Sequence, residues 1–109
     1  MEPVNFTNIT FEPFGITVEQ GAVVFKQYDN GDIAVQVVDD KEGLYTTATV
    51  NLEAYGIRPE PGHVIIADYS ENQGVWKALA EIGVISEPVR EFSFGGFDAR
   101  AVSCKLLVG

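Results

Sequence analysis

Hydrophobic residues along this chain follow two different periods, and the only stretch with a helical period is residues 68–85, DYSENQGVWKALAEIGVI. Apolar side chains recur there at i, i+3, i+4 and i+7, which predicts a helix with one core-facing stripe. The stripe consists of Val75, Ala78, Leu79 and Ile82. Trp76, the only tryptophan, lies about 100° around the helix from Val75, at the edge of the stripe.

Both ends of this helix have recognisable signals. Ser70 followed by Gln73 matches a capping box, in which the hydroxyl and the amide satisfy the first free backbone N–H groups. Gly83 can adopt the left-handed conformation that commonly ends a helix. We therefore expect the helix to start near Ser70 and to stop at Gly83.

Two strands and the turn between them are predicted to form a β-hairpin. Residues 22–28 and 33–39 are apolar, β-branched runs on either side of Asp29-Asn30-Gly31-Asp32. Asn-Gly favours a type I′ turn, because both central residues of that turn need positive φ.

Period-two alternation predicts further strands. In residues 44–52, Leu44, Ala48, Val50 and Leu52 share one face, which we expect to be buried. Residues 63–68 are apolar and predict a central strand. The remaining predictions are an N-terminal arm or edge strand, strands at 15–19, 89–94 and 97–108, turns at 20–21, 39–43 and 95–96, a loop at 53–62 and a break at 86–88.

Together these segments predict an α+β fold: a mainly antiparallel sheet of about six strands with one helix packed on one face. Most connections are too short for a parallel crossover, which favours antiparallel pairing. A small barrel flanked by the helix is the alternative. Without a linker, a repeat or a low-complexity stretch, the 109 residues predict a single domain spanning 1–109.

The charge balance is strongly acidic, with 16 Asp+Glu against 7 Lys+Arg and a formal net charge of −9. Such a surface repels phosphate backbones and anionic lipid headgroups, so we expect neither direct nucleic-acid binding nor membrane binding. A basic protein is the partner that this charge favours. General solubility explains the same acidity without any partner.

The candidate chemistry is sparse. Cys104 is the only cysteine, which excludes an internal disulfide and favours a reducing, cytoplasmic location. His63 is the only histidine, so a histidine-rich zinc site is excluded. No phosphate loop, nucleophile elbow or dinucleotide fingerprint is present, and we expect no cofactor and no metal. This favours a protein that is not an enzyme, although the sequence does not decide the question.

Two groups of residues are candidates for an interaction site. Asp39, Asp40 and Glu42 crowd one predicted turn without matching a calcium loop, and a solvated hairpin turn would also explain them. Tyr69, Asn72 and Trp76 surround the predicted helix start, where amphipathic aromatic side chains could recognise a partner. Ordinary packing at the margin of the core is the other interpretation of the two rings.

The chain also contains an ordered series of short motifs: F-G at Phe14, Y-x-N-G-x-I-A-V-Q over residues 28–36, Y-x-T-x-T-V-N-L over 45–52, D-Y-S-E-N-x-G-V over 68–75 and G-F at Gly96. This series resembles a bacterial domain family of unknown function that occurs in gut-type bacteria and in their plasmids and phages. The resemblance covers nearly the whole chain. It implies a small bacterial accessory protein of the kind found on mobile elements, and it implies no catalytic residues.

Three functional hypotheses follow. The leading one is a non-enzymatic protein-interaction module of bacterial or mobile-element origin, and a narrower version is an acidic counter-defence (anti-CRISPR-like) inhibitor whose carboxylates imitate phosphates. The second is a small-ligand-binding protein or minor enzyme with a pocket near Tyr69, Asn72 and His63. The third is a structural subunit that oligomerises through an exposed sheet edge. The sequence leaves the oligomeric state open.

Overall fold

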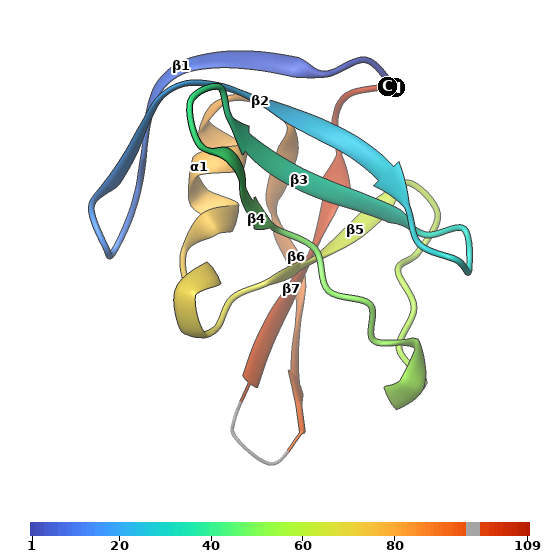
Figure 1. Cartoon of the computed structure of the whole chain (residues 1–109). Helices are drawn as coiled ribbons and strands as arrows, with labels where there is room; N and C mark the ends of the chain where they lie inside the picture. Colours follow the sequence, from blue (N-terminus) through green and yellow to red (C-terminus); the bar gives the residue numbers. More distant parts are fainter. Residues whose placement is uncertain (96–98) are drawn as a thin grey trace.

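The structure, a computed structural model, describes residues 1–95 and 99–109. The strands of these residues form two antiparallel sheets, which confirms the α+β fold class (Figure 1). The first sheet has the order β1-β2-β3-β4 and consists of β1 (Val4–Phe11), β2 (Ile16–Gln27), β3 (Ile33–Asp39) and β4 (Gly43–Thr47). The second has the order β5-β7-β6 and consists of β5 (His63–Ala67), β7 (Ala99–Leu106) and β6 (Ile85–Phe94).

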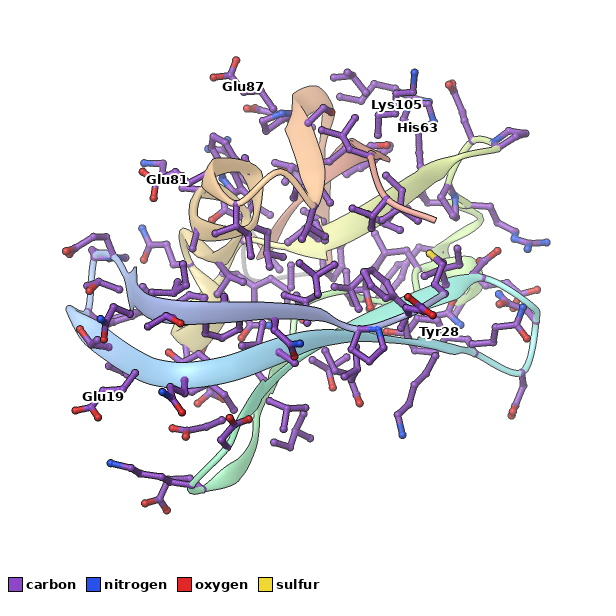
Figure 2. All side chains as sticks on the ribbon, turned by 90° about the horizontal axis from the view of Figure 1, so that it is seen from above. Glu19, Tyr28, His63, Glu81, Glu87 and Lys105 are labelled. Atoms are coloured by element: carbon purple, nitrogen blue, oxygen red, sulfur yellow. The ribbon has the colours of Figure 1, made fainter. Side chains whose placement is uncertain are left out.

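The two sheets form two layers with apolar side chains packed between them (Figure 2). Val23, Val35 and Val37 from the first sheet belong to the same buried cluster as Val64 and Val102 from the second. The helix α1 (Val75–Glu81) adds its predicted stripe to this cluster, because Val75, Ala78 and Leu79 are buried while Ile82 is partly buried. The core therefore lies between the sheets and beside α1.

The helix is shorter than predicted, and the capping box is wrong. Residues 70–72 form a separate 3₁₀ turn, Ser70–Asn72, and α1 begins only at Val75. Gly74 separates the two, with a φ of 79°, and a Cβ atom there would overlap the carbonyl oxygen of Glu12. The N–H of Gly74 donates instead to Oδ1 of Asp68 at 2.8 Å. Gly83 has the expected positive φ, 80°, just after the helix.

The β2–β3 hairpin is confirmed, with Gln27 opposite Ile33, but its turn is not type I′. Tyr28 and Asp32 close a three-residue loop through a hydrogen bond from Tyr28 N to Asp32 O of 2.8 Å. Of the three loop residues only Gly31 has positive φ. A loop of this length places one residue in the left-handed region instead of two.

No turn interrupts β2 at residues 20–21, contrary to the prediction. Gly21 continues the strand opposite Asp39, and a Cβ atom on it would overlap the carbonyl oxygen of Val38 and press on the ring of Phe6. Glycine is needed here because a neighbouring strand and a ring approach its backbone closely, and not because the chain reverses.

The segment from residue 44 to residue 52 does not form one alternating strand. The strand β4 ends at Thr47, and the chain then crosses to the second sheet, where Thr49 bridges Ile66. Ala48 and Leu52 are buried as predicted, but Leu44 is 58% exposed because it belongs to the first sheet and lies on its outer face opposite Val38.

Two predictions for the second sheet are also wrong. Strand β5 lies at the edge of its sheet, and the central strand is β7. Residues 86–88 do not break the chain but lie inside β6, where the pairing register shifts on both sides of Pro88. An edge strand accepts a proline because one side of it needs no partner. The predicted turn at Gly95 and Gly96 and the strand start at Phe97 fall mostly outside the described residues.

The N-terminal segment is an edge strand, one of the two predicted possibilities. The register of β1 against β2 runs from Val4 opposite Val23 to Phe11 opposite Ile16, and Asn8, with a φ of 54°, is left out of it. The tip of this hairpin curves away from the rest of its sheet and past α1 (Figure 1). Residues near this bend and at the hairpin tip line two grooves.

Candidate functional site

The predicted recognition patch at the helix start is divided among three separate contacts. The ring of Tyr69 packs edge-on against Phe94, with centroids 5.7 Å apart. Asn72 accepts a hydrogen bond from the Thr46 hydroxyl at 2.6 Å and donates one to the Thr47 carbonyl at 2.9 Å. Trp76 is half-buried against the core, and the Lys77 ammonium lies 5.8 Å from its ring centroid.

These contacts assign mainly structural work to the three residues. Tyr69 covers the end of the second sheet, Asn72 ties the 3₁₀ turn to β4, and Trp76 lies at the margin of the core, as its position beside the stripe predicts. The structure therefore does not bring them together as one patch.

The acidic turn joins β3 to β4. Oδ1 of Asp39 accepts a hydrogen bond from the backbone N–H of Lys41 at 2.9 Å, and the N–H of Asp40 donates to the carbonyl oxygen of Gln20 at 2.9 Å. The second contact anchors the turn beside β2. Glu19 of β2 thereby joins the acidic residues, with its Oε2 atom 3.3 Å from the Lys41 ammonium.

These residues line a groove of about 450 Å³, which we call the acidic groove. Its lining residues come from β1, β2 and the β3–β4 turn: Thr7, Asn8, Thr17, Glu19, Gln20, Asp39, Asp40, Lys41 and Glu42. Four carboxylates and one ammonium give this lining a formal charge of −3. Sequence reasoning found the turn but missed Glu19, which is about 20 residues away along the chain and is placed by the strand pairing alone.

A second groove, of about 360 Å³, lies between the tip of the β1–β2 hairpin and β4, and we call it the apolar groove. Its lining residues are Phe14, Ile16, Tyr45, Thr46, Glu71 and Asn72. Phe14 and Ile16 are 54% and 45% exposed and form one apolar wall of this groove. This groove is not recognisable in the sequence, because the residues of its two walls are far apart in the chain.

Tyr45 forms part of the apolar groove and stacks on Phe11, with ring centroids 4.9 Å apart. Burial, and then the nearby Glu71 carboxylate, raise the pKa of Tyr45 above its ordinary value. Its hydroxyl therefore stays protonated at neutral pH and can act as a hydrogen-bond donor.

Nucleophilic chemistry at Cys104 is disfavoured by its surroundings. The side chain is completely buried, and burial raises the pKa of the thiol to about 12, so the reactive thiolate is scarce at neutral pH. Its cross-strand partner is Val64, while His63 is paired with Lys105 and points to the opposite face. A Cys-His pair is therefore absent. The predicted role of Cys104 as a small apolar side chain agrees with its place in the core cluster.

The pocket expected near Tyr69, Asn72 and His63 is not formed by these residues. His63 begins β5 and Tyr69 follows its end, so the strand alone separates them by about 13 Å or more at 3.3 Å per residue. Figure 2 shows His63 beside Lys105 at the far end of the second layer. Its Nδ1 atom lies 3.0 Å from the Pro61 carbonyl.

No family model, curated protein or solved structure matches this chain. The resemblance to a bacterial domain family thus stays a prediction, and functional inference depends on the surface itself. Among the described residues, no three His, Cys, Asp or Glu side chains are arranged to hold a metal ion. Within the same part of the chain, no helix has the length and apolar character needed to cross a lipid bilayer.

Proposed function

We propose that this protein is a non-enzymatic interaction module that binds a basic segment of a partner protein in the acidic groove. One observation carries the proposal: the fold adds Glu19 to Asp39, Asp40 and Glu42 around a single concave surface that holds only one cation, Lys41. Opposite charges on a partner would speed association and fix its orientation, while the exposed setting keeps each individual attraction weak.

The cation already present in the groove does not block this role. Lys41 and Glu19 are both highly exposed, 75% and 68%, and such surface ion pairs contribute little to stability. A lysine or arginine of the partner can replace Lys41 beside Glu19 at small cost.

The counter-defence hypothesis is a special case of this proposal. A partner that normally binds nucleic acid has a basic groove, and an acidic surface could occupy it in place of phosphates. The cytoplasmic location and the mobile-element origin likewise stay predictions. Competition between this protein and duplex DNA for such a partner would separate the special case from the general one.

The general proposal is tested with a fluorescently labelled octalysine peptide and fluorescence anisotropy. The double substitution Asp40→Asn/Glu42→Gln removes two charges from the groove, neither of which has a side-chain hydrogen bond within the described residues. We expect binding to weaken roughly thirtyfold, because two lost attractions of about 1 kcal/mol each in water add to about 2 kcal/mol. Raising NaCl from about 0.05 M to about 0.5 M should weaken binding of the unaltered protein as well.

The matched control is Glu81→Gln/Glu87→Gln, which makes the same change in net charge on the α1 and β6 side of the molecule (Figure 2). Its binding should change by less than about twofold, since Glu81 and Glu87 lie on the other layer of the molecule from Glu19 and salt screens interactions between distant exposed charges (Figure 2). If both double variants lose affinity equally, only the net charge matters and the acidic groove is not the site.

A further inference from the structure

The first third of strand β2, residues 16–19, has a free hydrogen-bonding edge among the described strands. Pairing of β2 with β3 begins at Gly21 opposite Asp39, whereas pairing with β1 extends back to Ile16. Among the strands of the described chain, residues 16–18 are therefore paired with β1 alone, and Glu19 is in neither register. The free edge ends at Gln20, because the carbonyl oxygen of Gln20 accepts a hydrogen bond from the N–H of Asp40. The edge presents unpaired backbone groups that a further strand can use.

The two grooves lie on opposite faces of this free edge. Side chains of a strand alternate between its faces, so Ile16 points to one side and Thr17 to the other. Ile16, with Phe14, lines the apolar groove, while Thr17, with Glu19, lines the acidic groove. The β3–β4 hairpin forms the opposite wall of both, through Glu42 on the acidic side and Tyr45 on the apolar side.

We propose that the partner contributes an extended segment that pairs as an added strand with residues 16–19, and that basic and apolar residues alternate along this segment. The inference rests on the proposed function and specifies the partner's form. Backbone hydrogen bonds to the edge of β2 would supply affinity, and the alternation would place cations in the acidic groove and apolar side chains in the apolar groove.

A second copy of this chain does not suit the surface as well as a basic partner does. Each copy has a net charge of −9, and the acidic groove borders the edge that would have to pair. Pairing two such edges would bring like charges together, which opposes association. Charge complementarity therefore selects a basic segment.

The first experiment compares two capped eight-residue peptides of equal composition by fluorescence anisotropy. One alternates Lys and Val, and the other has four Lys followed by four Val. We expect the alternating peptide to bind at least about tenfold more tightly, since only it can fill both grooves while paired. Two N-methylated forms of the alternating peptide, modified at every second residue in opposite phases, test the backbone pairing. The peptide methylated in one of the two phases should bind roughly tenfold more weakly or worse, because its hydrogen bonds to β2 are blocked.

The second experiment changes the apolar groove without touching the acidic one. Phe14→Thr and Ile16→Thr should each weaken binding of the alternating peptide and leave octalysine binding unchanged. Both residues are about half exposed, so the variants should keep their thermal stability. Val89→Thr is the matched control, since Val89 is 57% exposed on β6 in the other sheet.

The outcomes separate this inference from the proposed function. Equal binding of the alternating and block peptides, or no effect of N-methylation in either phase, overturns strand addition. In that case octalysine binding still supports the acidic groove as a binding site. If octalysine does not bind, or if its binding does not depend on the carboxylates of the acidic groove, both the proposed function and strand addition are overturned. If the protein self-associates and the alternating peptide does not reverse this, a second copy occupies the edge. That result would also overturn the inference.

Discussion

At the scale of single residues, polar side chains hold together segments that are distant in the chain. Thr49 is buried, and its hydroxyl accepts a hydrogen bond from the N–H of Val35 at 3.1 Å and lies 2.9 Å from the Tyr28 hydroxyl. Asp68 accepts from Gly74 and forms an ion pair with Arg100, with a separation of 3.4 Å. Such contacts give these polar residues structural roles, so their presence does not indicate a functional site.

Asn72 provides a direct test of this interpretation. Asn72→Ala removes both hydrogen bonds to β4 and leaves the partly buried Thr46 hydroxyl and Thr47 carbonyl without these partners. We expect the free energy of unfolding to fall by about 1–3 kcal/mol, measured by urea denaturation. The neighbouring Gln73 is exposed, and Gln73→Ala should change the free energy of unfolding by less than about 0.5 kcal/mol. Equal stability of the two variants would contradict a structural role for Asn72.

At the scale of elements, close approaches between segments decide where helices and strands begin and end. The stripe of α1 was predictable because it depends on residues three and four apart. Its start was not, because it depends on Glu12 lying against Gly74. The continuity of β2 through Gly21 has the same kind of cause, since Val38 and Phe6 lie against that glycine.

The two glycines flanking α1 allow the effect of close approach to be measured. Both have positive φ, 79° at Gly74 and 80° at Gly83, but a Cβ atom on Gly83 would meet nothing within 4 Å. Gly83→Ala should therefore cost only the left-handed penalty of about 1–2 kcal/mol. Gly74→Ala adds an overlap with the Glu12 carbonyl and should cost roughly 2–5 kcal/mol. Denaturation curves that show equal losses would exclude the overlap as a determinant of the helix start.

At the scale of the whole molecule, the charge is the dominant feature of the surface. Most of its 7 cations already contact carboxylates, as Arg58 does with Asp32 and Arg100 with Glu91, at 2.6 Å in both pairs. The hydrogen bond to Asp32 is the main reason why the pKa of Arg58 is raised. The remaining carboxylates repel one another, which opposes the compact state and also opposes self-association.

Salt should therefore stabilise this protein. Between about 0.02 M and 0.5 M NaCl we expect Tm to rise by about 3 °C or more, because screening reduces the repulsion of the net charge of −9. Asp40→Asn/Glu42→Gln should have a higher Tm than the unaltered protein at low salt and a smaller salt response. Light scattering at high concentration should show a monomer. A Tm that is constant or falls with salt would exclude repulsion as a significant term.

The features of this protein that depend on near neighbours in the chain were predictable from its sequence. Alternation and turn residues located the hairpin of β2 and β3, the stripe of α1 was visible in its spacing, and the acid-rich β3–β4 turn was visible in its composition. The division into two sheets, the crossing at Thr49 and the bend at Asn8 arise only when the chain folds. The same is true of the place of Glu19 beside the acidic turn and of the free edge at residues 16–19 between two grooves. The reason is physical: these features depend on which strands pair and how closely their backbones approach, and residues far apart in the chain determine that together.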